Sequence, residues 1–432
     1  MRRMMMDNSS LASNPHYSVF VSANAGTGKT RALTHRVFRL LLNGVSPDSI
    51  LCVTYTKAAA VEMKERLQKT LATWAVCKES ELLAELQEMS EPNPSQDKIQ
   101  IARQLFASIL DNENGPRIET IHSFCQSILS RFPIEAGVPP GFDLLTEAEA
   151  NSLLQKNLQE LFATPIAEIQ QKLKFLASIT DERTLSEYLT KILQKRDIID
   201  RFATDGTASA RFKEHLKDII GCKTLSEFTD DKAFLMQRVR QLPLKEIANC
   251  LYLGGKNDKQ ASAKINHWLS LSPRQAEAEF LCLTDVFFAS GNPKSTLASK
   301  AVQKHEPEIK NYIADAQDQI LAYMQAQSGA FTSELSHSIC LLAANLYLSF
   351  QRQKFQYGVL DFDDLIFFTD QLLSKDQIQA WVRWKLETAI QHVLVDEAQD
   401  TSPTQWSVIS HLVSEFFLSD EVEPLPRTLF AV

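Results

Sequence analysis

The sequence predicts an α/β protein whose parallel sheet is interrupted by a large, mostly α-helical insertion. Residues 17–75 read as strand, loop, helix, strand and helix, which is the start of a βαβ unit, and such units build parallel sheets. Residues 132–354 carry helical patterns rich in Leu, Gln and Lys, without convincing strand alternation. Apolar strand patterns return at 389–395 and 428–432, so the sheet is expected to resume after the insertion.

A loop of small residues that ends in Lys-Thr lies between the first predicted strand, 17–21, and the first predicted helix, 31–42. Small residues let phosphates approach backbone N–H groups, and the N-terminus of a helix attracts anions. Lys29 adds a positive charge and the Thr30 hydroxyl can ligate Mg²⁺. The loop opens with Ala where the usual pattern has Gly, and a Gly-rich turn of no function is the alternative. We interpret it as a nucleotide-binding loop made of Ala23, Asn24, Ala25, Gly26, Thr27, Gly28, Lys29 and Thr30.

The next elements alternate between short apolar runs and helical spacing. A strand is predicted at 50–54 and a helix from Ala58 onward. Breaks at 91–95 and 112–116 separate further helices and introduce a short strand at 117–121. The last helix of the insertion has one apolar stripe, formed by Leu335, Ile339, Leu342, Leu346 and Phe350.

Two carboxylates follow the apolar run that ends at Val395. In nucleotide hydrolases the first carboxylate of such a pair holds Mg²⁺, and the second orients and deprotonates the attacking water. We therefore predict that Asp396 is a metal ligand and that Glu397 is the general base. A buried strand capped by an acidic turn is the alternative. Lys29 and Asp396 lie far apart in sequence, and a large insertion must separate strands that are neighbours in space.

Composition and charge narrow the class of protein. A hydrophobic content of 44% and a charged content of 23% are ordinary for a globular protein, and no apolar run has the length of a membrane span. The net charge of -8 argues against nucleic-acid binding, but residues 1–75 hold ten Lys or Arg against four Asp or Glu. Seven scattered cysteines without a Cys-x-x-Cys pair predict free thiols, a cytoplasmic location and no zinc site. Residues 1–16 are expected to form a disordered leader.

Five ordered segments resemble motifs of superfamily 1 DNA helicases of the UvrD/Rep type. They are the phosphate loop, residues 52–63 (motif Ia), 120–125 (motif Ic), the Asp-rich segment 361–365 and Asp-Glu-Ala-Gln-Asp at 396–400 (motif II). The flanks at 131–137 and 401–406 resemble the AddA subunit of bacterial AddAB helicase–nucleases. The resemblance implies a RecA-like domain 1A formed by residues 17–132 and 355–432, and a helical domain 1B formed by residues 133–354.

The same resemblance implies roles for further residues. Gln399 would couple the nucleotide state to DNA grip, as a third catalytic residue beside Lys29 and Glu397, and Arg31 would lie near adenine, although it can equally be a solvated residue. The implied cofactors are ATP and Mg²⁺, and the implied partners are single- and double-stranded DNA and an AddB-like protein. The implied DNA contacts are Thr54, Tyr55, Thr56, Lys57, His122 and Phe124. For the segment Thr54 to Thr56 the alternative is a Thr-rich helix cap before Ala58, which is compatible with DNA contact, and for His122 and Phe124 the alternative is core packing.

Asp361, Asp363 and Asp364 suggest either a metal site or a helix cap, and we favour the cap. Relatives usually carry a Gln before the phosphate loop that reads adenine, whereas the first Gln here is Gln68. The sequence stops before motif III, which predicts little ATP hydrolysis by this chain alone. Two alternatives stay open. One is a split or degenerate gene product that binds ATP and DNA without catalysis, with the second motor domain supplied by a separate chain. The other is a phosphate-loop enzyme outside the helicases.

Overall fold

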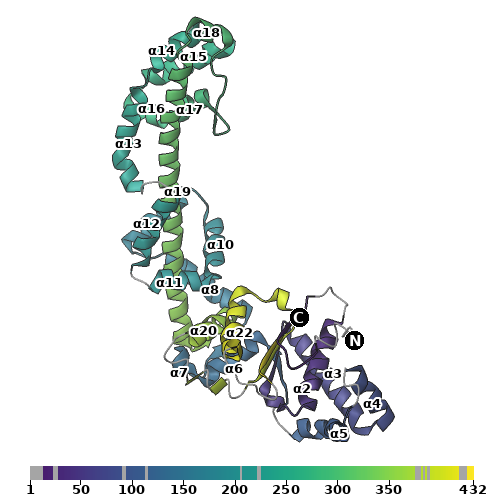
Figure 1. Cartoon of the computed structure of the whole chain (residues 1–432). Coiled ribbons are helices and arrows are strands. Elements are labelled where there is room, and N and C mark those ends of the chain that lie inside the picture. The colour runs from purple at the N-terminus through teal and green to yellow at the C-terminus, as the bar shows by residue number, and fades with distance from the viewer. Residues whose placement is uncertain are drawn as a thin grey trace, which may run out of the picture. The chain divides into compact units, whose positions relative to one another are not determined.

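The computed structural model describes residues 13–22, 28–89, 94–111, 115–204, 207–220, 225–374, 381–382, 385–386, 390–417 and 426–432 (Figure 1). The chain divides into two compact units. Unit 1 comprises Met1–Gln155 and Phe350–Val432, and unit 2 comprises Lys156–Ser349. The boundaries predicted for domains 1A and 1B are not tested by this division and stay a prediction.

A five-stranded sheet with the order β1-β9-β8-β2-β3 forms the centre of unit 1. All of its neighbouring strands pair in parallel. Its strands are β1 (Val19–Phe20), β2 (Ile50–Thr54), β3 (Arg117–Thr120), β8 (His392–Val395) and β9 (Thr428–Ala431). The predicted α/β class with a parallel sheet is therefore confirmed, and the fold fits a RecA-like domain.

Both faces of the sheet are covered by helices, which explains why β2 and β8 are apolar without alternation. Along β2, Ile50 and Cys52 pack into one hydrophobic cluster with α2, α3, α4 and α5, whereas Leu51 and Val53 pack into another with α6, α7, α20 and α22. The helices are α2 (Lys29–Leu42), α3 (Lys57–Val76), α4 (Glu79–Glu88), α5 (Gln96–Asp111), α6 (Ile121–Arg131), α7 (Pro133–Ala136), α20 (Phe362–Ser374) and α22 (Pro403–Val413).

The segment before β1 is held against α2. Arg36 is fully buried and donates hydrogen bonds to the carbonyl oxygens of Asn14 (2.7 Å) and Tyr17 (2.6 Å). Arg39 donates to the Ser13 hydroxyl at 3.0 Å. Ser13 and Asn14, which make these contacts, belong to the predicted leader 1–16, and residues 1–12 lie outside the described part of the chain. The disordered leader stays a prediction.

Unit 2 is mostly helical, as its sequence predicts, and a single hydrophobic cluster joins α13 to α17 with α19 (Ile309–Tyr357). The chain of α19 runs on into unit 1. Two short strands, β5 (Phe288–Ala289) and β6 (Asn292–Pro293), form an antiparallel pair. They are too short to give the alternation that a sequence pattern needs. The other helices in or entering this unit are α8 (Glu147–Phe162), α9 (Ala167–Ala177), α10 (Glu182–Leu193), α11 (Arg196–Thr204), α12 (Ala208–Ile220), α13 (Leu225–Arg240), α14 (Leu244–Tyr252), α15 (Lys256–Ser270), α16 (Pro273–Ala278), α17 (Phe280–Phe287) and α18 (Lys300–His305).

The end of α19 leads back to the sheet domain. Gly358, with φ of 65°, ends the helix, and β7 (Val359–Leu360) then pairs in parallel with β4 (Asp143–Leu144). Among the described residues, no helix combines the length and the apolar composition that a membrane crossing requires.

Candidate functional site

The N-terminus of α2 lies after β1 at the carboxyl edge of the parallel sheet. Gly28 is the N-cap of α2 and has φ of 88°, a left-handed conformation that favours glycine. Lys29 and Thr30 are the first two residues of the helix, and Thr30 is exposed. Residues 23–27, which complete the predicted phosphate loop, lie outside the described residues, so Ala23, Asn24, Ala25, Gly26 and Thr27 keep their predicted role without a structural account.

Asp396 and Glu397 follow β8 at the same edge of the sheet. The backbone N–H of Asp396 donates to the Val53 carbonyl at 2.9 Å, and that of Ala398 donates to the Val432 carbonyl at 2.7 Å. The acidic turn is therefore tied to the chain on both sides of β8. Glu397 has φ of 51°, an uncommon conformation for a residue with a Cβ atom, and such strain gathers at functional sites. No sequence pattern predicts this conformation.

Lys29 and the acidic turn meet across the sheet edge. Lys29 Nζ lies 3.9 Å from Glu397 Oε2, and the two side chains are 16% and 46% exposed. The amide of Gln399 donates a hydrogen bond to the same carboxylate oxygen. The structure thus brings together the three predicted catalytic residues, which come from the two ends of the sequence.

Asp396 lies beside this pair in a half-buried position. Burial raises the pKa of its carboxyl group above the ordinary aspartate value, and the negative charge of Glu397 raises it further. A hydrogen bond from the Glu397 backbone N–H to Asp396 Oδ1 (3.1 Å) and the charge of Lys29 act in the opposite direction. The ionised carboxylate is therefore held in surroundings that favour a cation beside it.

The donor set at this edge fits Mg²⁺. Magnesium in nucleotide sites takes one or two protein oxygens and completes its shell with water and substrate phosphates. The Asp396 carboxylate and the Thr30 hydroxyl offer such oxygens. Within the described residues, no group of three or more His, Cys, Asp or Glu side chains could hold a metal ion.

Arg31 follows Thr30 on α2 and contacts a helix that the sequence did not connect with the site. Its guanidinium forms an ion pair with Glu88, the last residue of α4, and donates to His35 Nε2 at 3.4 Å. Burial lowers the pKa of His35, and the Arg31 charge lowers it further. Glu88 was missed because it lies 57 residues away in sequence.

The residues after β2 differ in their accessibility. Thr54 is 1% exposed, and its hydroxyl donates to the Thr56 carbonyl at 3.1 Å. The Thr56 hydroxyl accepts a bond from the Ala59 N–H at 3.1 Å and caps α3. Tyr55 is 58% exposed and Lys57 is exposed too, so both side chains are accessible at this edge of the sheet.

His122 and Phe124 lie on α6 in different surroundings. Phe124 is 1% exposed within the hydrophobic cluster, with the Arg117 guanidinium 5.6 Å from its ring centre. His122 is half-buried and meets the ring of Phe362 edge to face, with 5.5 Å between centroids. Burial lowers the pKa of His122. Phe124 therefore packs in the core, which was the alternative to a DNA contact, while the His122 side chain stays partly accessible.

The aspartates at the start of α20 form a cap. Asp361 Oδ1 accepts a bond from the Asp364 N–H at 3.0 Å, and Asp364 Oδ2 accepts one from the Asp361 N–H at 3.1 Å. Both carboxylates also pair with Lys354, which sequence reasoning missed. Lys354 follows Leu346 and Phe350 at four-residue spacing, so a lysine on the apolar stripe of this helix was the available signal.

Comparison with known proteins agrees with this arrangement. The model of the family described as "UvrD/REP helicase N-terminal domain" matches residues 6–419. A protein of Ligilactobacillus salivarius, named as the A subunit of an ATP-dependent helicase/nuclease, is 25% identical over 91% of this chain and 32% of its own length. Proteins of the same name from Listeria welshimeri and Exiguobacterium sibiricum are 24% and 26% identical, over 91% and 93% of this chain and 32% and 33% of their own lengths.

The resemblance to UvrD/Rep helicases and to the A subunits of helicase–nucleases is thereby confirmed. The chain spans about a third of the length of the curated relatives that it matches.

Proposed function

The chain belongs to the UvrD/REP helicase N-terminal domain family, and from this we propose that it binds ATP with Mg²⁺ at the carboxyl edge of its sheet and single-stranded DNA beside it. In this proposal it supplies the first motor domain of an ATP-dependent DNA helicase that acts in DNA repair. Residues 17–132 and 355–432 then correspond to domain 1A, and residues 133–354 to domain 1B.

One observation carries the proposal. Lys29 Nζ and Glu397 Oε2 lie 3.9 Å apart, although their residues are separated by almost the whole chain. A lysine at a helix N-terminus and a carboxylate after another strand of the same parallel sheet are the two sides of a nucleoside triphosphate site, and here β9 lies between the two strands. An acidic turn that only capped a strand would not need a phosphate-loop lysine beside it.

Each residue then has a defined task. Lys29 binds the β- and γ-phosphates as a point charge, and Thr30 and Asp396 hold Mg²⁺. When bound, the ion offsets charge on the phosphates. Glu397 accepts a proton from the attacking water. Its ion pair with Lys29 would make the carboxylate a weaker base, and a bound phosphate frees the carboxylate because it replaces Glu397 as the partner of Lys29. Gln399 contacts Glu397 and lies on the exposed side of the turn, where it can sense DNA.

The DNA contacts are proposed at the same edge of the sheet. Tyr55 offers an exposed ring for base stacking, Lys57 offers charge for phosphates, and His122 offers an accessible imidazole. Thr54, Thr56 and Phe124 support these side chains from the cap and the core rather than by direct contact.

The relatives are about three times as long as the region that they share with this chain. Their name includes a nuclease, and we assign no nuclease activity to these residues. A cytoplasmic location and a partner that resembles AddB are proposals that follow from the scattered cysteines and from the relatives' name.

Nucleotide binding by the Lys29→Ala variant tests the proposal. We expect the dissociation constant for a fluorescent ATP analogue with Mg²⁺ to rise roughly 10- to 100-fold, because a charge-assisted contact to phosphate is lost. Lys78→Ala is the control, since Lys78 is exposed at the start of α4. Equal affinities of Lys29→Ala and the wild type, or a wild type that binds no ATP, would contradict the proposed site.

A further inference from the structure

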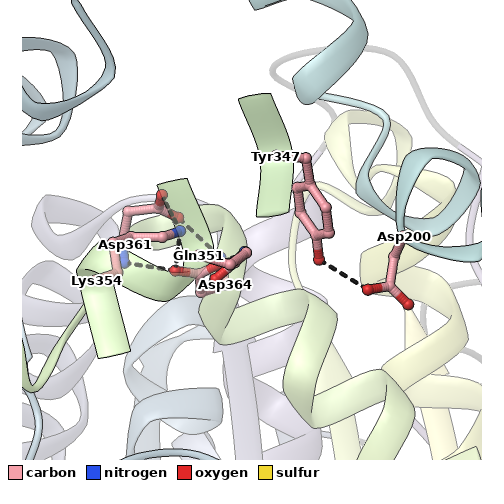
Figure 2. A network of polar contacts seen from close by, with 6 residues as sticks. All are labelled: Asp200, Tyr347, Gln351, Lys354, Asp361 and Asp364. Atoms are coloured by element: carbon pink, nitrogen blue, oxygen red, sulfur yellow. Dashed lines mark hydrogen bonds and ion pairs between the residues drawn. The ribbon is translucent and has the colours of Figure 1, made fainter. Parts of the chain in front are cut away.

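A lysine with no exposed surface lies near the C-terminal end of α19. Lys354 is 0% exposed, and its ammonium group lies 4.3 Å from the centre of the Phe350 ring, one turn earlier on the same helix. It pairs with Asp361 Oδ2 at 2.9 Å and with Asp364 Oδ2. Figure 2 shows this cluster, in which Lys354 points from α19 toward the start of α20.

Every carboxylate oxygen of the cluster receives a hydrogen bond. Asp361 Oδ1 and Asp364 Oδ2 accept backbone N–H groups of the α20 cap, and Asp364 Oδ1 accepts the Gln351 amide at 2.8 Å. The Lys354 ammonium group donates hydrogen bonds to Asp361 Oδ2 and Asp364 Oδ2. Two negative charges therefore face one positive charge, and the N-terminus of α20 offsets the remainder. These contacts together fix the start of α20.

Stability alone does not explain such a cluster. Removing charges from water costs about as much free energy as their pairing returns, and apolar residues of similar volume often stabilise a core as well. A cluster in which every charged atom has a partner does fix one geometry, because any shift leaves a buried charge without its partner. Among the described residues of this cluster, only the Gln351 amide oxygen, which carries no formal charge, is buried without a hydrogen-bond partner. The cluster therefore fixes the geometry of the start of α20.

Phe362 lies between the two aspartates, so the cluster also fixes its position. Phe362 is the first residue of α20, and its ring meets His122 edge to face at 5.5 Å. Phe362 is 39% exposed, so the two rings form a surface pair. Helix α20 packs along α6, which carries His122. The position of the α20 cap therefore determines where the ring of Phe362 stands beside His122.

We propose that the buried Lys354–Asp361–Asp364 cluster positions Phe362 against His122 and thereby shapes the single-strand binding surface of unit 1. This proposal rests on the proposed function, since it assumes that the His122 side of the sheet edge contacts DNA. Lys354 is in this view a positioning residue, which acts on DNA only through Phe362 and His122.

Two sets of variants test the cluster. The first is the triple variant Lys354→Met, Asp361→Asn and Asp364→Asn, which removes all three charges, leaves no buried charge unpaired and keeps side chains that can cap α20. The second is Lys172→Met with Glu334→Gln, which neutralises a partly buried ion pair in unit 2 and serves as the matched control. Lys354→Met alone is used only to measure stability, because it leaves two buried carboxylates.

Three quantities are measured on the full chain. They are the dissociation constants for a short fluorescent oligothymidylate and for the Mg²⁺–ATP analogue, and the pKa of His122 from its imidazole NMR signal, which the His122→Asn variant identifies by its loss. In the triple variant we expect single-strand affinity to fall roughly five- to tenfold, as for partial loss of one stacking contact, with unchanged nucleotide affinity. The pKa of His122 should rise toward its ordinary value, since burial by Phe362 is relaxed.

The outcomes separate the positioning role from a structural one. Unchanged single-strand affinity together with an unchanged His122 titration would overturn the positioning role, and so would an equal loss of DNA and nucleotide affinity, which indicates general unfolding. If the wild type itself binds no single strand, the proposed function fails. The His122 titration in the triple variant then still decides whether the cluster positions Phe362.

Discussion

At the scale of the residue, the two neighbouring carboxylates of the acidic turn have different surroundings, and we propose different tasks for them. Asp396 is half-buried and its pKa is raised, first by burial and then by the charge of Glu397. A raised aspartate pKa means that the neutral acid is favoured in the folded chain, so this group stabilises the fold at low pH and loses that contribution as the pH rises through its folded pKa. Magnesium binding requires the opposite, ionised state.

This conflict gives a prediction for the Glu397→Gln variant. Removing the neighbouring charge lowers the pKa of Asp396, so Mg²⁺-dependent nucleotide binding should persist to lower pH than in the wild type. Fluorescence titrations of the ATP analogue across the acidic range measure the pH midpoint. Glu62→Gln is the matched control, because Glu62 raises the same pKa least, and it should shift the midpoint less in the same direction. A midpoint that moves to higher pH in Glu397→Gln would contradict this account.

Sequence patterns predicted the residues of the site better than their conformations. Lys29, Glu397 and Gln399 were predicted from motifs, and the fold does bring them together. The left-handed backbone of Glu397 and the contact of Arg31 with Glu88 were not predictable, because both depend on how distant segments pack. Phe124 shows the limit of a motif, since a residue within one can belong to the core.

At the scale of the element, the strands and helices of unit 1 were predictable where the apolar pattern was strong. The strand at 50–54 matches β2, and the helix predicted at 31–42 starts two residues earlier, at Lys29, because the glycine before it caps the helix. The order of the strands in the sheet was not predictable from periodicity. Periodicity marks where a strand lies in the sequence, but it does not show that β8 pairs with β2 and β9 on its two sides.

The end of α19 gives a prediction at this scale. Gly358 has φ of 65° and a Cβ atom added there would meet no other atom within 4 Å, so only the backbone conformation opposes a side chain. We expect Gly358→Ala to lower the free energy of unfolding by about 1 kcal/mol. Gly358→Asn should cost less, because asparagine tolerates the left-handed region. Urea denaturation followed by circular dichroism measures both variants, and equal losses would show that steric contact, not conformation, limits this position.

At the scale of the whole molecule, the basic and acidic residues are distributed unevenly along the chain, so the net charge hides a basic region. The chain carries a net charge of -8, yet residues 1–75 hold ten Lys or Arg against four Asp or Glu, and residues 387–432 hold one Arg against eight acids. Lys57 and the acidic turn 396–400 lie at the same edge of the sheet, so we expect single-strand binding there to depend on a few cationic side chains. Binding should then involve few phosphates, so its dependence on salt concentration should be moderate.

We expect the small number of phosphate contacts to appear in the salt dependence of single-strand binding. With about two to four phosphates neutralised, the logarithm of the association constant should fall against the logarithm of salt concentration with a slope of about -1.5 to -3. Lys57→Ala should reduce the steepness of that slope by about 0.7, the contribution of one phosphate contact. Fluorescence anisotropy with a short oligothymidylate measures the slope over a series of salt concentrations.

Lys78→Ala provides the matched control, because Lys57 and Lys78 are both exposed and flank the same helix. Lys57 is the first residue of α3 at the carboxyl edge of the sheet, and Lys78 follows the other end of this 20-residue helix, about 30 Å away. Lys78→Ala should leave the slope unchanged. An equal change in both variants would mean that the single strand responds to the general basic charge around α3, and the sheet edge at Tyr55 and Lys57 would lose its proposed role.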